Sequence, residues 1–149
     1  MAAPDASRGL APLLWVLLAL FALRVAGQAL VAFFGAEFLP PMHEWYSGLL
    51  PYEILLPAQL VIIAVMVKIC VDFARGSGIF VAPRRFFAFY WLYFGYVYLA
   101  VMVARYPVQM VLHPEARWLG GTIPIVFHWV LAAFVIAVGL HHRRGLKAR

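Results

Sequence analysis

Long apolar runs alternate with short polar or proline-containing segments along this chain. Four runs come close to the roughly 20 residues that a helix needs to cross a hydrocarbon core, and they cover residues 10–34, 52–73, 86–104 and 119–140. Helix-breaking or turn-forming residues interrupt the segments between the runs; they are Pro40, Pro41, Pro51, Gly76, Gly78, Pro83, Pro107 and Pro114. The pattern predicts an all-α fold with one domain over residues 1–149, a bundle of four transmembrane helices arranged up-down-up-down.

The composition supports a membrane protein and argues against a soluble one. Hydrophobic residues make up 66% of the 149 residues and charged residues 12%, and the mean hydropathy is +0.91. A soluble domain carries about 25% charged residues, so this chain has too little polar surface to cover a globule in water. The net charge of +6 does not indicate nucleic-acid binding, because the basic residues gather at the ends of the apolar runs.

The distribution of basic residues predicts the orientation of the spans. Eight lie on one predicted side and two, Arg105 and Arg117, lie on the other. The eight are Arg8, Arg75, Arg84, Arg85, Arg143, Arg144, Lys147 and Arg149. Cytoplasmic segments of membrane proteins are enriched in Lys and Arg, so we expect both termini in the cytoplasm and the chain in a bacterial inner (plasma) membrane. Trp45, Tyr46, Tyr106 and Trp118 would then lie at the outer interface, where aromatic rings anchor.

The first apolar run also has an alternative interpretation as a signal peptide. Arg8 precedes an apolar stretch, and Gly27 and Ala29 are small residues of the type found before a cleavage site. The run nevertheless continues through "LVAFF" to Phe34. We therefore expect an uncleaved span; cleavage would instead leave a mature chain that begins near Leu30.

Several polar residues lie inside the predicted spans, mostly toward their outer ends. Arg24 lies roughly 15 Å below the outer end of the first span and His128 roughly 13 Å below that of the fourth, at about 1.5 Å per helical residue. Arg24 and Gln28 share a helical face because they are four residues apart. Glu53 and Gln59, six residues apart, point to different faces. The candidate set is Arg24, Gln28, Glu53, Gln59, Tyr98 and His128.

A buried arginine has two interpretations. A charge at the centre of a bilayer costs about 2.5–3.5 kcal/mol, so Arg24 needs a partner or water within the bundle. The candidate residues could line an outward-facing polar pocket that holds an anionic or carbonyl-bearing lipophilic ligand. Alternatively, Arg24, Gln28, Glu53 and His128 could form an interhelical polar clasp, a hydrogen-bonded set that only fixes helix packing. The sequence leaves both open.

Evidence for a metal or cofactor is weaker. His43 and Glu44 in the first outer loop, with His113 and Glu115 in the second, are residue types that bind zinc or copper. They lack the close spacing of known metal-binding motifs. A haem held by two histidines needs a second His within a span, and only His128 lies firmly inside one. We expect no cofactor.

The sequence contains no recognisable catalytic set, which favours a protein that is not an enzyme. The first hypothesis is an accessory, assembly or packing subunit of a membrane complex, which associates with another membrane protein or with further copies of itself. The alternative is binding or processing of a lipophilic small molecule or lipid in the pocket around Arg24, Gln28, Glu53 and His128. A self-sufficient transporter ranks third, because four spans leave little room for a path.

Overall fold

The computed structural model describes residues 4–45, 51–112, 114 and 122–148. Helices account for most of these residues, and no strand occurs among them. The elements in chain order are α1 (Pro4–Phe34), α2 (Met42–Trp45), α3 (Tyr52–Arg75), the π-helical turn η1 (Phe87–Trp91), α4 (Leu92–Leu112) and α5 (Thr122–Lys147). The predicted all-α class is confirmed.

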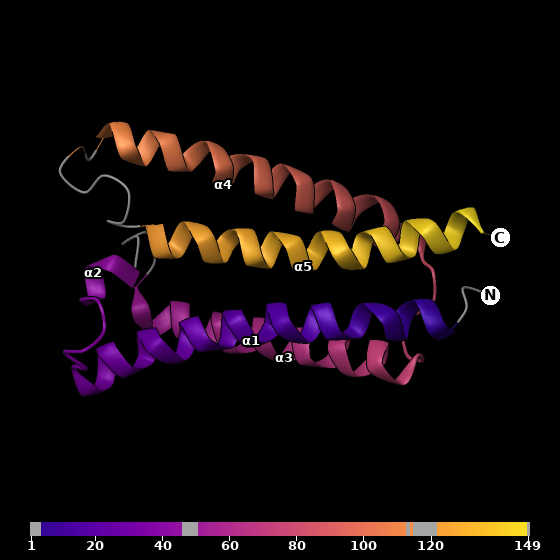
Figure 1. Ribbon diagram of the computed structural model, residues 1–149, viewed down its shortest axis with the longest axis horizontal. Coiled ribbons are helices and arrows are strands. Elements are labelled where there is room, and N and C mark those ends of the chain that lie inside the picture. Colours follow the sequence, from indigo (N-terminus) through magenta and orange to yellow (C-terminus); the bar gives the residue numbers. More distant parts are fainter. Residues whose placement is uncertain (1–3, 46–50, 113, 115–121, 149) are drawn as a thin grey trace.

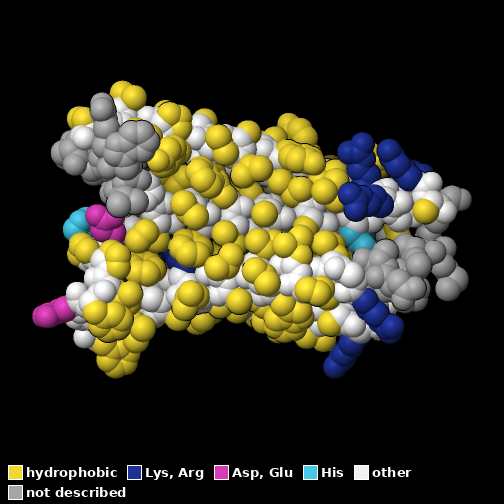
Figure 2. Space-filling model, in the orientation of Figure 1, with side chains coloured by type: hydrophobic (Ala, Val, Ile, Leu, Met, Phe, Trp, Pro, Cys, Tyr) yellow, Lys and Arg dark blue, Asp and Glu magenta, His cyan; other side chains and the backbone are white. Residues whose placement is uncertain are grey.

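Four helical segments are long and apolar enough to cross a membrane: Ser7–Phe34, Tyr52–Arg75, Phe87–Leu112 and Thr122–Lys147. Large hydrophobic side chains stay exposed along the first three segments, where Leu23, Val61 and Tyr93 are each more than 60% exposed; in the fourth, Val126 is 41% exposed. Figure 2 shows hydrophobic side chains over the middle of the visible face, with Lys and Arg gathered at one end and Asp and Glu at the other. Contiguous exposed apolar surface of this kind is typical of helices that face lipid.

The helix boundaries follow local chemistry. The α1 helix ends before Gly35, which has φ +59°, and α3 ends before Gly76, which has φ +69°. These left-handed conformations suit glycine because it has no Cβ. The backbone N–H groups of Gly76 and Ser77 donate to carbonyls of the last turn of α3, so two of its carbonyls keep partners. Pro51 precedes α3 at its N-cap, where the missing N–H is not needed.

The third apolar segment is longer than the sequence indicated. We expected it to end near Ala104, before Pro107, but α4 continues through Pro107 to Leu112. A proline removes one backbone hydrogen bond yet is tolerated in membrane helices when neighbouring groups satisfy the released carbonyl. Arg105 therefore belongs to a helix and not to an outer loop, which changes the composition of the candidate site.

The helices pack in the lateral order α3, α1, α5, α4. Close backbone contacts join α1 to α3, α1 to α5, and α5 to α4, and Figure 1 shows α5 between α4 and α1. Within the described part of the chain, α3 and α4 make no such contact. The bundle therefore consists of two helix pairs, α1 with α3 and α4 with α5, which meet along α1 and α5.

Contacts between distant residues place one end of each long helix together. Arg8 of α1 donates to the carbonyl of Arg75 at the end of α3, His141 of α5 contacts Phe73 of α3, and His142 stacks on Phe87 of η1 at 4.8 Å between ring centroids. This end carries most of the basic side chains (Figure 2), and we call it the basic end. It comprises Arg8, Arg75, Arg84, Arg85, Arg143, Arg144 and Lys147.

The hydrophobic core occupies the half of the bundle nearer to the basic end. It is built from three helices, α1, α3 and α5, and its most buried members are Leu14, Ile69, Cys70, Phe73, Phe134 and Val138. In the α4–α5 pair, small residues permit close approach: a Cβ on Gly139 would lie 3.1 Å from the Leu92 Cα. Small residues at such crossings are typical of membrane helix pairs. The half away from the basic end is packed less completely, and the candidate site lies there.

Candidate functional site

A cavity of about 280 Å³ lies between the two helix pairs. Each long helix contributes to its wall, and α2 contributes Trp45. Its polar and charged lining side chains are Arg24, Gln59, Tyr98, Arg105 and His128. Its remaining lining residues are Phe21, Trp45, Leu55, Ile62, Met102, Pro124, Phe127 and Leu131. The structure therefore brings four of the six residues singled out in the sequence to one cavity.

Arg24 is buried, at 6% exposed, and is held by the connection between α1 and α3. Its Nη2 donates a hydrogen bond of 2.8 Å to the backbone carbonyl of Trp45. The Trp45 indole Nε1 donates in turn to the carbonyl of Pro40 at 2.8 Å. Trp45 is only 7% exposed, so its ring packs against protein; its expected place at the outer interface stays a prediction. Its ring lies over Gly27, where an added Cβ would come within 2.7 Å of the ring carbon Cη2.

Gln59 and Gln28 form a buried amide pair beside the cavity. Gln59 Nε2 donates to Gln28 Oε1 at 3.3 Å, which joins α3 to α1. Gln59 lines the cavity, whereas Gln28 is completely buried and lies outside the lining. This contact is an interhelical hydrogen bond of the kind that the clasp interpretation requires, but it joins only these two of the candidate side chains. Gln59 Oε1 and Gln28 Nε2 have no hydrogen-bond partner in the structure.

His128 and Tyr98 approach the cavity from α5 and α4. Their ring centroids lie 5.8 Å apart. His128 Nδ1 contacts the carbonyl oxygen of Pro124, one turn earlier. A carbonyl can only accept, so Nδ1 carries the hydrogen and Nε2 is the acceptor in the neutral ring. His128 therefore lies in the cavity wall with an acceptor nitrogen.

Arg105 is the cavity residue that the sequence interpretation missed. We had placed it in an outer loop because Pro107 was expected to end the helix. In the structure Tyr98, Met102 and Arg105 follow 4-3 spacing on one face of α4, and all three line the cavity. That spacing is visible in the sequence once the helix is allowed to continue through Pro107.

Two candidate features do not enter the site. Glu53 lies in the first turn of α3, is exposed and does not line the cavity. His43 Nε2 lies 3.9 Å from Glu44 Oε1 on α2, whereas His113 and Glu115 lie outside the described residues. Within the described ranges, no group of three or more His, Cys, Asp or Glu side chains comes together that could hold a metal ion.

The charge of the cavity is unbalanced. Arg24 and Arg105 come from helices that do not contact each other, and the described lining residues include no Asp or Glu. Arg24 Nε is buried without a hydrogen-bond partner. Unpaired cations in an apolar environment are costly, and an anion that accepts hydrogen bonds from them removes that cost. The arrangement is suited to binding an anion, and it brings together no nucleophile with an activating base.

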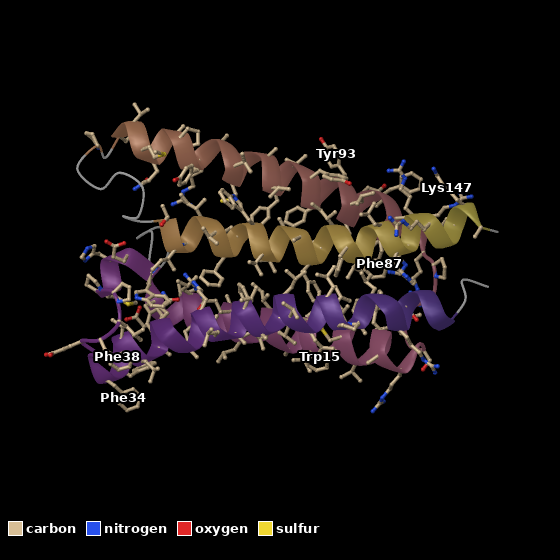
Figure 3. All side chains as sticks on the ribbon, in the orientation of Figure 1. Trp15, Phe34, Phe38, Phe87, Tyr93 and Lys147 are labelled. Atoms are coloured by element: carbon tan, nitrogen blue, oxygen red, sulfur yellow. The ribbon has the colours of Figure 1, made fainter. Side chains whose placement is uncertain are left out.

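A second hollow lies near the basic end, on the outer side of α4 and α5. Its volume is about 470 Å³, and its lining includes Tyr93, Tyr96, Arg143 and Lys147. Figure 3 shows Tyr93 pointing away from the bundle. Tyr93 is 73% exposed, so this hollow is a surface feature, unlike the cavity between the helix pairs.

Comparison of the chain with protein-family models, with curated proteins and with solved structures found no match.

Proposed function

We propose that the protein binds a lipophilic ligand with an anionic head in the cavity between its two helix pairs. The observation that carries this proposal is the convergence of Arg24 and Arg105 on a cavity whose described lining has no carboxylate. Gln59, Tyr98 and His128 add hydrogen-bonding groups around the two guanidinium groups. A purely structural clasp would pair the cations with an acid, and Glu53, the acid that the clasp interpretation assigned to this role, is exposed and outside the lining.

The ligand is lipophilic because of where the cavity lies. We propose that the four apolar helices cross a bacterial inner membrane in up-down-up-down order, with the basic end in the cytoplasm. The grouping of Lys and Arg at that end supports this orientation. The cavity then opens in the outer half of the membrane, where its ligand is an amphiphile of the bilayer or a small lipophilic anion.

Binding of dodecyl phosphate tests the proposal. The purified protein in an uncharged detergent is titrated with dodecyl phosphate, and dodecyl phosphocholine serves as the zwitterionic comparison. We expect Arg24→Gln and Arg105→Gln each to weaken dodecyl phosphate binding about tenfold or more, since a hydrogen bond to a charged group contributes about 1.5–3 kcal/mol. Arg85→Gln, an exposed site at the basic end, is the matched control. Unchanged affinity in both cavity variants would refute the proposal.

A second candidate is association with another membrane protein or with a further copy of the chain, as an accessory or assembly subunit. It is favoured by Tyr90, Tyr93 and Tyr96, which lie three residues apart and are 69%, 73% and 49% exposed. Lipid tails cannot hydrogen-bond their hydroxyl groups, whereas a partner helix can. Native mass spectrometry of gently extracted protein tests it: a bound second chain, lost when the three tyrosines are changed to leucine, supports association, and a monomer with lipid alone counts against it.

A further inference from the structure

The cavity has a polar level and an apolar level. Three of its polar residues, Arg24, Gln59 and His128, belong to α1, α3 and α5, and Arg105 belongs to α4. On each helix another lining residue occurs three positions nearer to the basic end, and each of these is apolar: Phe21, Ile62, Leu131 and Met102. Three residues correspond to about 4.5 Å along a helix. We call these four polar groups the polar level and the four apolar residues, about one turn deeper on each helix, the apolar level. Tyr98, one turn deeper again on α4, adds a polar side chain on the inner side of the apolar level, and its ring lies 5.8 Å from that of His128.

The basic end serves as the common reference for this comparison. Arg8 contacts Arg75, Phe73 contacts His141, and Phe87 contacts His142, so the four long helices are aligned there. The apolar level accordingly lies on the same side of the polar level in all four helices. A ligand that fits both levels has a polar anionic head, with an apolar chain that points toward the basic end and the middle of the bundle.

The cavity is too small to enclose such a ligand completely. Its volume of about 280 Å³ lies at the lower limit of pockets that hold small molecules, which are about 300–1,000 Å³. A head group and the first part of a chain fit within it, and the rest of a long chain must leave through the wall.

On one side of the wall the backbones of the neighbouring helices do not approach each other closely. Backbone contacts close the bundle between α1 and α3, between α1 and α5, and between α4 and α5. In the described residues no corresponding contact joins α3 to α4. Leu55 and Ile62 of α3 and Tyr98 and Met102 of α4 line the cavity from the two sides of this seam. These four residues are only half-buried, so a chain that passes between α3 and α4 does not have to part the close contacts of α1 with α3, α1 with α5 or α4 with α5.

We infer that the ligand is a long-chain anionic lipid that enters laterally between α3 and α4, with its head at the polar level and its chain in the seam. This inference rests on the proposed function and adds the ligand class, the orientation and the route. Such a ligand fits the α3–α4 seam for two reasons. Its chain would leave contact with bilayer lipid for contact with apolar side chains, and its anionic head would form interactions with Arg24 and Arg105.

The position of the chain is tested by photo-crosslinking. The probe is dodecyl phosphate with a diazirine at the end of its chain, added to the purified protein in uncharged detergent. We expect crosslinks in α3 and α4 that unlabelled dodecyl phosphate competes away and that the double variant Arg24→Gln, Arg105→Gln loses. The same probe with a phosphocholine head controls for lipid contact with exposed surface. Competed crosslinks on the outer face of α1, or none that are competed, would contradict the lateral route.

The apolar level is tested by filling it. Met102→Trp enlarges a side chain at that level, while Met110→Trp makes the same exchange two turns away on α4, outside the lining. We expect Met102→Trp to weaken dodecyl phosphate binding about tenfold and to leave methyl phosphate binding unchanged, because methyl phosphate needs only the polar level. Met110→Trp should bind both probes as the parent does, and thermal unfolding of both variants shows whether the fold is intact.

The two proposals fail in different ways. If the parent protein binds neither methyl phosphate nor dodecyl phosphate, the anion site itself is wrong. If the parent binds both equally, with the Arg24→Gln effect present but no competed crosslinks in α3 or α4, the anion site stands and the lateral lipid route is wrong. Equal binding of dodecyl phosphate by Met102→Trp and Met110→Trp would also count against the route.

Discussion

The guanidinium group of Arg24 donates a 2.8 Å hydrogen bond to the backbone carbonyl of Trp45, 21 residues later in the chain. This contact joins the buried charge of α1 to the last residue of α2, so the connection between α1 and α3 forms part of the cavity wall. One donor of Arg24 is used in this way, while its Nε has no partner. Arg24 therefore both holds the connection and offers a charge to the cavity, and variants can separate the two roles.

Arg24→Lys should preserve the fold and impair binding. A lysine can still donate to the Trp45 carbonyl, so we expect the free energy of unfolding to change by less than about 1 kcal/mol. It cannot reproduce the two-pronged contact of a guanidinium group with a phosphate, so dodecyl phosphate affinity should fall about tenfold. Thermal unfolding and titration in the same detergent provide the two measurements. Full affinity in Arg24→Lys would indicate that Arg24 acts mainly as a clasp.

Arg24→Leu should damage both properties. It leaves the Trp45 carbonyl without its donor, at a cost of about 1–3 kcal/mol, and it removes the charge from the cavity. We expect a lower unfolding temperature together with loss of dodecyl phosphate binding. A variant that keeps its parent's affinity would remove Arg24 from the binding site.

Gly27→Ala should displace Trp45. The new methyl group would come within 2.7 Å of the Trp45 ring, and overpacking of this kind costs about 1–3 kcal/mol. Gly9→Ala, on the same helix, has no heavy atom within 4 Å of its added Cβ, and alanine is the better helix former. We expect the first variant to unfold at a lower temperature and the second to match or exceed the parent. Equal stability of the two would show that the Trp45 ring does not rest on Gly27.

The contact of α4 with α5 can be tested by a double-mutant cycle. A Cβ on Gly95 would lie 2.7 Å from Ile136 Cγ1, so Gly95→Ala should destabilise the protein. Ile136→Ala removes the obstructing atom, and Gly95→Ala should then cost less, with a coupling energy of about 0.5–3 kcal/mol. Unfolding of the parent, both single variants and the double variant gives the cycle. The same cost in both backgrounds would indicate that this contact does not limit the helix approach.

The proposed orientation predicts which residues are accessible from outside intact cells. In a Cys70→Ala background, we expect a cysteine replacing Glu37 to react with an impermeant thiol reagent and one replacing Ser77 not to react. Both positions are exposed in the structure and lie at opposite ends of α3 and its connections, so only the membrane should separate them. Reaction of the Ser77→Cys protein in intact cells would reverse the orientation.

The sequence by itself determined the all-α class and four segments able to span a membrane, because apolar runs of about 20 residues have few other stable solutions. It also singled out Arg24 and His128, since polar side chains stand out within such runs. It could not decide whether Arg24 has an acid partner, because the distance of Glu53 from the cavity depends on helix rotation. The tertiary structure alone placed Arg105 in the cavity, because continuation of α4 through Pro107 depends on what its neighbours satisfy. Only the tertiary structure, likewise, showed that the backbones of α3 and α4 do not contact each other. Which helices pair depends on which faces fit closely together, and in the α4–α5 contact Gly95 and Gly139 permit that close fit.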